Sequence, residues 1–153
     1  MTIFMNKLLI IFFLFKINIE FQESKFYGIW DAEKFCPRNE NGDFIGGAIA
    51  PGIKTSAEYL ISKAALLNDI DLKFPKNIIG KDTKENIQSG IMYGAIDQVE
   101  GMIKRINNET KINNHIILTG GFSKLLSPKL KINHTLDMDL TLKGMIFIYE
   151  SNN

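Results

Sequence analysis

The hydrophobic and polar positions of this chain are most regular in its middle. Apolar side chains recur there at helical spacing, which predicts one long helix over residues 83–107 with a buried stripe. Asp82 followed by Glu85 forms a capping pair at the start of this helix. The stripe consists of Ile87, Ile91, Val99, Met102, Ile103 and Ile106.

Shorter patterns come before this helix. The segment Asp43–Ala50 leaves an Asn-Gly turn, which predicts a strand. Thr55 followed by Glu58 is a capping box, and it predicts a helix that ends near Asn68. The buried face expected for that helix consists of Leu60, Ala64 and Leu67.

The last third of the chain predicts a short buried strand at 115–118, a turn at 119–121 and a helical start at 122–126. A final helix is expected over 137–149, capped by Asp139, with apolar side chains such as those of Leu140 and Ile148 buried. The order of these elements, from the first predicted strand onward, favours an α/β fold over a helical bundle.

A continuous apolar run, Leu8–Phe15, follows Lys7 near the start of the sequence. Such a run is typical of a signal peptide, but no small-residue cleavage pattern follows it. It is too short to cross a bilayer as a helix. A buried strand has the same pattern. We therefore favour a buried strand or a non-native leader over a true signal.

Composition sets wide limits on function. The 153 residues are 45% hydrophobic and 23% charged, enough for one domain with a core. The net charge of +1 gives no indication of a nucleic-acid partner. Cys36 is the only cysteine, so no internal disulfide can form, and a reducing compartment is favoured. With His115 and His134 it offers no metal-ligand spacing.

Glycines mark the most unusual segment, the string Gly46-Gly47-Ala48-Ile49-Ala50-Pro51-Gly52. Gly46 and Gly47 permit a positive φ or a close approach of a ligand or a second backbone. Pro51 followed by Gly52 predicts a turn. The string fits a strand edge that lines a small-molecule site, and it fits a bulged hairpin without a ligand equally well.

Three further glycines, Gly90, Gly94 and Gly101, lie inside the long predicted helix. Each costs about 1 kcal/mol relative to alanine in a helix interior. Gly90 and Gly94 are four residues apart on one face, so a second backbone packed there would explain them. A buried helix that simply tolerates glycine is the alternative.

Two short segments could contact a substrate. Gly120 and Gly121 follow a predicted strand and precede a helix, a geometry suited to a phosphate or a nucleoside, although a plain turn is more frequent. Thr83 at a helix N-terminus can hydrogen-bond a polar substrate or merely cap the helix. The sequence shows no nucleophile–base pair: Cys36 has no nearby histidine, and His134 is interpreted as a surface or core residue.

Taken in order, these strings resemble the C-terminal half of the type III pantothenate kinase family, over about residues 39–151. The Gly-Gly-Ala-Ile-Ala-Pro-Gly string and the Thr-x4-Gln-Ser-Gly string are specific to the resemblance, whereas Thr-Gly-Gly is not. The matching segments are 41–52, 80–90, 119–121 and 139–144.

The resemblance implies an actin-like, hexokinase-like fold (ASKHA) built from two ribonuclease-H-like halves. This chain would supply one half, residues 39–153, after a poorly matching segment at 1–38. The family phosphorylates pantothenate with ATP, the first step of coenzyme A biosynthesis, using Mg²⁺ and a monovalent cation, K⁺ or NH₄⁺. It works as a cytoplasmic homodimer, without nucleic acid or membrane, and binds pantothenate near the dimer interface.

The same resemblance implies roles for particular residues. Thr83 matches a threonine that contacts pantothenate, and Gly120 and Gly121 match the turn on the adenosine side. Four residues of the glycine-rich string would lie near the site: Gly46, Gly47, Pro51 and Gly52.

The chain also departs from the family. An Asp-x-Gly-Asn-Thr phosphate loop and a Gly-x-Asp-Arg segment, whose Asp is the general base, are both absent, so no catalytic residue is assigned. Gly28 stands at the cation-binding aspartate position, so no metal ligand is assigned either. Trp30 and Asp31 replace a glycine and an ATP-contacting threonine. A carboxylate there would face the polyphosphate.

These departures predict a truncated copy with impaired or no activity alone. The main alternative is a non-catalytic remnant that pairs with an intact kinase through the Gly90 and Gly94 side of the long helix. A sugar- or acyl-kinase relative and an exported protein are the remaining, less favoured alternatives.

Overall fold

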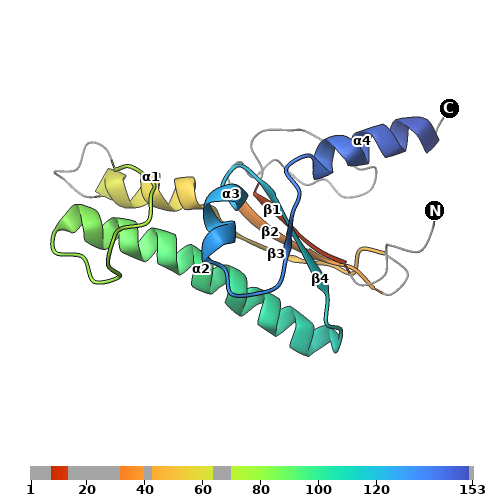
Figure 1. The fold of residues 1–153 in the computed structure, drawn as a ribbon, viewed down its shortest axis with the longest axis horizontal. Helices are drawn as coiled ribbons and strands as arrows, with labels where there is room; N and C mark the ends of the chain where they lie inside the picture. The colour runs from red at the N-terminus through yellow and green to blue at the C-terminus, as the bar shows by residue number, and fades with distance from the viewer. Residues whose placement is uncertain (1–7, 14–31, 40–42, 64–69, 152–153) are drawn as a thin grey trace.

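A computed structural model describes residues 8–13, 32–39, 43–63 and 70–151, and within them five strands form one mixed sheet (Figure 1). The sheet order is β3-β2-β1-β4-β5. Strands β1, β2 and β3 pair antiparallel in turn, whereas β4 runs parallel to β1 and β5 parallel to β4. The strands are β1 Leu8–Phe13, β2 Ala32–Pro37, β3 Ala48–Pro51, β4 His115–Gly120 and β5 Thr135–Leu136.

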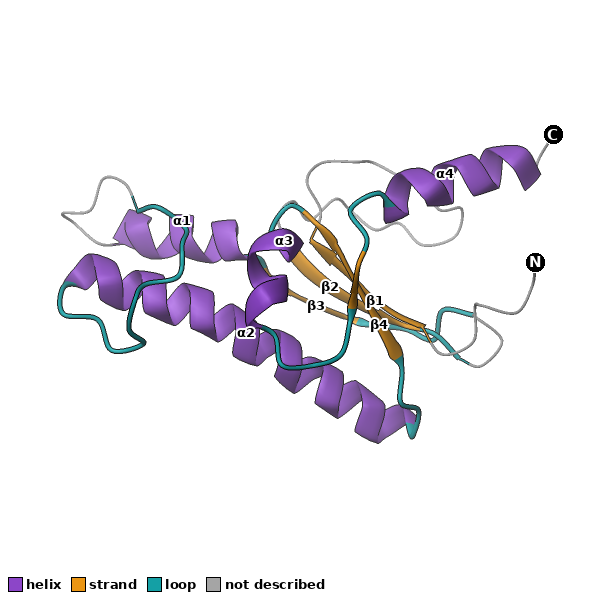
Figure 2. Cartoon of the chain, in the orientation of Figure 1, coloured by secondary structure: helices purple, strands orange, loops and turns teal. Residues whose placement is uncertain are grey.

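Helices and strands both contribute, so the α/β class is confirmed (Figure 2). The long helix α2 runs beside the sheet, with α1 alongside its first half (Figure 1). Helix α4 follows the edge strand β5 and extends away from the sheet (Figure 1). The helices are α1 Ile53–Lys63, α2 Thr83–Thr110, α3 Ser123–Leu126 and α4 Leu140–Ser151, with one 3₁₀ turn, η1 Ser127–Lys129, directly after α3.

The apolar run near the start of the chain forms the central strand. Leu8–Phe13 is β1, which pairs with β2 on one side and with β4 on the other. Continuous apolar runs are typical of interior strands of a sheet, and β1 is such a strand, with a neighbour on each side. The strand interpretation of this run is therefore confirmed for these six residues. Leu14 and Phe15 lie outside the described residues.

The long helix begins where the sequence predicts. The Asp82 side chain accepts a hydrogen bond from Glu85 N at 2.8 Å, as an N-cap should. The Glu85 carboxylate in turn accepts from Lys81 N at 2.9 Å. The helix continues three residues beyond Asn107 and ends where Lys111 adopts a left-handed conformation with φ 57°.

The first helix and strand of the glycine-rich region differ from their predictions. β3 is only Ala48–Pro51, so the strand predicted over Asp43–Ala50 is wrong in its first half. Helix α1 begins at Ile53, before Thr55, because Ser56 N already donates to the Gly52 carbonyl at 2.9 Å. Thr55 is therefore inside the helix and does not cap it.

The buried face of α1 also differs. Ile53 and Ala57 are buried there, whereas Leu60 is 46% exposed, so its predicted burial is wrong. Leu60 lies on the same helix face as Ile53, but it borders an open hollow beside Gly90 and Gly94 of α2, where little packs against it. Ala64 and Leu67, and the predicted end near Asn68, lie outside the described residues.

Helix α4 starts three residues later than predicted. Lys143 N donates to the Asp139 carbonyl at 2.9 Å, which places Asp139 at the cap position as expected. The predicted burial is wrong for Ile148, which is 45% exposed. The reason is that α4 leaves the sheet instead of packing along it (Figure 1).

The core lies between the sheet and α2. The predicted stripe is confirmed, with Ile91, Val99 and Ile103 buried and the other three members packed against the core. The fully buried side chains with the largest volumes include Phe35 on β2, Met92 on α2 and Leu118 on β4. The core comprises Phe35, Ile53, Ala57, Ile91, Met92, Ala95, Ile96, Val99, Ile103, Ile116, Leu118, Leu126 and Leu130.

Candidate functional site

The glycine-rich string forms a bulge between β2 and β3. Arg38 bridges to Phe44 and Phe35 pairs with Ala48, so four steps on one strand match three on the other. Gly46 supplies the positive φ of 114° that this bulge needs. A Cβ built at Gly47 would lie 2.2 Å from the Phe35 carbonyl oxygen. Both glycines are thus required by the hairpin itself.

Beyond the bulge, the chain passes a cavity of about 230 Å³ between β2, β3, α1 and α2. Pro51 lines it from the end of β3, and Gly90 and Gly94 line it from α2. The Glu33 side chain reaches it from β2 and is only 1% exposed. The remaining lining residues are Ile53, Ser56, Leu60, Ile91, Ala95 and Gln98. This cavity brings a predicted near-site residue, Pro51, together with the two helix glycines.

The start of α2 is held by buried polar side chains. Gln88 Nε2 donates to the Asp71 carbonyl at 2.7 Å, and Ser89 Oγ donates to the Ile78 carbonyl. Both side chains are buried, at 4% and 7% exposure. They fasten the connection before α2 to the helix, and they leave Thr83 exposed on the first turn. Thr83 is therefore free of packing and open to a ligand or a partner.

The turn after β4 lies at the carboxyl ends of two parallel strands. The turn predicted at 119–121 is wrong for its first two residues, because β4 extends to Gly120, which pairs with Phe13 of β1. Gly120 has φ 94°, in the region that favours glycine. Its carbonyl accepts from Ser123 Oγ at 2.5 Å, and Thr119 is buried beside it. This sheet edge is where α/β sheets bind ligands. Helix α3 that follows spans only four residues, so it contributes little helix dipole to an anion.

One chain does not bring these two segments together. Figure 1 places the start of α2 at one end of the molecule and the turn after β4 near α3, close to its middle. Thr83 lies in the first turn of α2, whereas Gly120 ends β4, the strand that follows the last turn of that helix. The two segments thus lie in different parts of a single copy of this chain.

A comparison with known proteins covers the glycine-rich string and the start of α2, and it ends before the turn after β4. The model of the type III pantothenate kinase family matches residues 32–105, which contain the bulge, the cavity lining of β3 and α2, and the start of α2. The resemblance to type III pantothenate kinases is thereby confirmed over this segment. The match also includes β2, which the sequence analysis assigns to the poorly matching segment.

A solved structure shares the fold. A conserved protein from Campylobacter jejuni, assigned to the Baf family of transcriptional activators, superposes with a TM-score of 0.60 at 15% identity. The alignment covers 96% of this chain and 59% of that chain, so the present chain spans about three fifths of the length of this neighbour. At this identity the likeness concerns the fold alone.

The described acidic, histidine and cysteine side chains do not form a cluster suited to a metal ion. Among residues 8–13, 32–39, 43–63 and 70–151, no three His, Cys, Asp or Glu side chains gather as a metal site would require. Glu33 is a single carboxylate and does not meet that requirement. Gly28, Trp30 and Asp31 lie outside the described residues.

The structure shows a serine–histidine pair that the sequence did not predict. Ser127 Oγ and His134 Nε2 lie 2.8 Å apart, and His134 Nδ1 lies 2.8 Å from the Ile132 carbonyl. A carbonyl only accepts, so Nδ1 carries the proton and Nε2 accepts from the Ser127 hydroxyl. The seven-residue separation across η1 gives no sequence signal for this contact. Cys36 forms no comparable pair, and burial raises the pKa of its thiol.

No helix in the described part of the chain combines the length and the hydropathy that a membrane crossing requires. The exposed apolar helix α4 has 12 residues, shorter than a bilayer-spanning helix.

Proposed function

We propose that this chain is one ribonuclease-H-like half of an actin-like, hexokinase-like kinase fold of the type III pantothenate kinase family. The match over residues 32–105 carries this proposal, because it includes both family-specific strings. The family reaction, ATP-dependent phosphorylation of pantothenate to 4'-phosphopantothenate, is then the activity in which the chain takes part. A cytoplasmic location follows from the same proposal.

The sheet supports the proposed lobe. Its order, β3-β2-β1-β4-β5, has three antiparallel strands followed by two that run parallel to β1. This is the order of a ribonuclease-H-like sheet. The central strand comes from the segment 1–38, so that segment contributes to the lobe in the proposal even though its sequence matches the family poorly.

The separation of the two ligand-contacting segments favours a homodimer. Thr83 would contact pantothenate, and Gly120 and Gly121 would contact the adenosine side of ATP. Because the start of α2 and the turn after β4 lie in different parts of one copy (Figure 1), one copy would supply Thr83 to a site whose nucleotide contacts come from another copy. Pantothenate would then lie close to the interface between two chains.

We propose further that the isolated chain is inactive or nearly so. Phosphoryl transfer depends on positioning and on neutralising charge at the phosphates. The sequence has neither the family phosphate loop nor the segment with the general base. The described carboxylates do not replace them, since they do not gather into a metal site.

A second function has its own supporting observation. Gly90 and Gly94 are exposed on α2, and a Cβ built at either would meet nothing within 4 Å. The glycines therefore leave open space that no described element of this chain fills. A helix of an intact kinase could approach closely there, which supports the interaction-module alternative.

Calorimetry with ATP and with pantothenate, in the presence of Mg²⁺ and K⁺, tests the proposed lobe. Binding of either ligand, weakened by Thr83→Ala for pantothenate or by Gly120→Val for ATP, would support the proposal that this chain forms a ligand site. A folded chain, verified by circular dichroism, that binds neither ligand would contradict the kinase role and favour the interaction module.

A further inference from the structure

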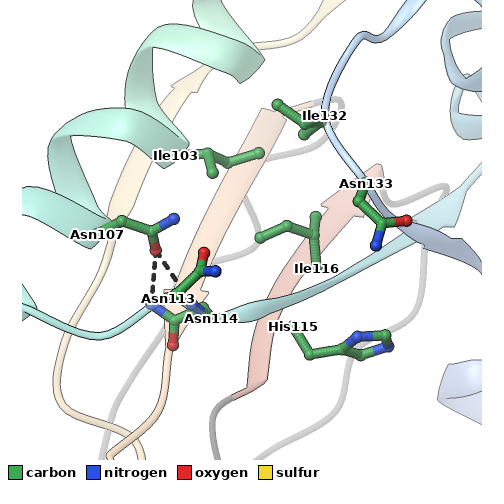
Figure 3. Close-up of a pocket in the computed structure, with 8 residues that line it drawn as sticks. All are labelled: Ile103, Asn107, Asn113, Asn114, His115, Ile116, Ile132 and Asn133. Atoms are coloured by element: carbon green, nitrogen blue, oxygen red, sulfur yellow. Dashed lines mark hydrogen bonds between the residues drawn. The ribbon is translucent and has the colours of Figure 1, made fainter.

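A second cavity, of about 380 Å³, lies at the other end of β4 from the glycine turn. It is bounded by the last turns of α2, the start of β4 and the segment before β5 (Figure 3). Its volume falls in the range of small-molecule pockets. The lining residues are Ile103, Asn107, Asn113, Asn114, His115, Ile116, Ile132 and Asn133.

The chemistry of this lining is unusual. Four of the eight side chains are carboxamides, and three are isoleucines. The described lining contains no Asp, Glu, Lys or Arg side chain. The imidazole of His115 lies 3.1 Å from Thr135 Oγ1. Such a lining offers mostly neutral donors and acceptors beside an apolar surface, with one imidazole at its edge.

The carboxamides are ordered by their own hydrogen bonds. Asn107 Oδ1 accepts from Asn114 Nδ2 at 2.8 Å, and Nδ2 also lies 3.4 Å from the Ile112 carbonyl (Figure 3). Two acceptors around that atom fix it as the nitrogen. Asn114 is only 6% exposed, and its Oδ1 is buried without a hydrogen-bond partner among the described residues. That oxygen has no accessible surface and does not face the cavity, so the exposed carboxamides supply the contacts to a ligand.

Asn113 and Asn133 occupy the open side of the cavity. Figure 3 shows them on either side of Ile116, and both are exposed. A primary amide presents one donor edge and one acceptor edge, which complements a carboxamide on each side. The isoleucines would cover the apolar part of the same molecule.

We propose that this cavity binds an uncharged small molecule that carries an amide edge and an apolar body. The inference is independent of the kinase proposal, because the cavity contains none of the residues assigned to pantothenate or ATP. It sits at the opposite end of β4 from Gly120.

Benzamide and benzoate form a matched probe pair, equal in shape and different in charge. The test follows the side-chain amide signals of the ¹⁵N-labelled full chain by NMR during titration with each probe. We expect benzamide to shift the signals of Asn113, Asn114 and Asn133, and benzoate to leave them in place. Asn133→Leu should weaken benzamide binding about fivefold, the equivalent of one neutral hydrogen bond.

Asn108→Leu is the control variant, because Asn108 is exposed on α2 and does not line the cavity. It should leave the benzamide affinity unchanged. Equal shifts with benzoate, shifts that Asn113→Leu and Asn133→Leu leave intact, or no shift at the solubility limit of benzamide would each overturn the proposal. All these substitutions are at exposed positions, so a folded chain is expected in every case.

Discussion

Gln88 Nε2 donates a 2.7 Å hydrogen bond to the carbonyl oxygen of Asp71, seventeen residues earlier in the chain. Ser89 makes a similar bond to the Ile78 carbonyl. These two residues belong to the Thr-x4-Gln-Ser-Gly string. They hold the connection before α2 in place, so part of that string serves the structure and leaves Thr83 exposed for a ligand.

Removing the Gln88 amide should destabilise the fold. Gln88→Leu leaves the Asp71 carbonyl without this donor in a partly buried place, which costs about 1–3 kcal/mol of unfolding free energy. Urea denaturation measures the change. Asp97→Ala, at an exposed position of the same helix, is the control and should change stability by less than about 0.5 kcal/mol. Equal stability of both variants would contradict a structural role for Gln88.

Alanine at the bulge should also be costly. Gly47→Ala places a Cβ against the Phe35 carbonyl, so the hairpin must shift, at a cost of about 1–3 kcal/mol. Gly46→Ala meets open space but keeps a positive φ, which costs a similar amount as backbone strain. Thermal unfolding followed by circular dichroism measures both. A stability equal to that of the unsubstituted chain would mean that the bulge does not need these glycines.

Alanine in place of the glycines of α2 should raise the stability of the chain. Gly90→Ala, Gly94→Ala and Gly101→Ala each meet nothing within 4 Å, so each should stabilise the isolated chain by about 1 kcal/mol. If α2 packs on an intact kinase through Gly90 and Gly94, those two variants should weaken association, and Gly101→Ala should not. Analytical ultracentrifugation with an intact type III kinase measures the association. If all three variants associate as the unsubstituted chain does, Gly90 and Gly94 do not mediate helix packing on the kinase.

The free energy of unfolding should depend on pH through the Asp137–Lys143 pair at the start of α4. The Lys143 side chain beside Asp137, 2.8 Å away, lowers the pKa of that carboxyl. A lowered native pKa adds stability above the ordinary aspartate pKa of about 3.9, and this stability disappears as the pH falls through the native value. The effect should be small because Lys143 is exposed. Asp137→Asn should flatten the pH dependence of unfolding below about pH 4, and an unchanged profile would show that the pair adds no stability.

Much of the fold could be predicted from local patterns. The start of α2 and its apolar stripe followed from an N-cap residue and a helical period, both of which act within a few residues. The Leu8–Phe13 strand followed from a continuous apolar run. The bulge shortened β3 because Gly47 must approach Phe35, a contact set by pairing with β2 that the local sequence does not encode.

Parts of the site depended on contacts between distant residues. The Ser127–His134 pair, the Gln88–Asp71 bond and the asparagine-lined cavity all join residues whose spacing carries no periodic signal. The exposure of Ile148 likewise depends on where α4 leaves the sheet. The roles of Thr83, Gly120 and Gly121 rest on the family resemblance and remain predictions.

We propose that this chain has the site segments of one lobe and does not complete the family reaction alone. A single-turnover assay, with the chain in excess over ¹⁴C-pantothenate and with ATP, Mg²⁺ and K⁺, tests it most directly. We expect no phosphopantothenate from the chain alone. Stoichiometric product that disappears on Thr83→Ala would contradict it, because the chain would then contain a complete catalytic site.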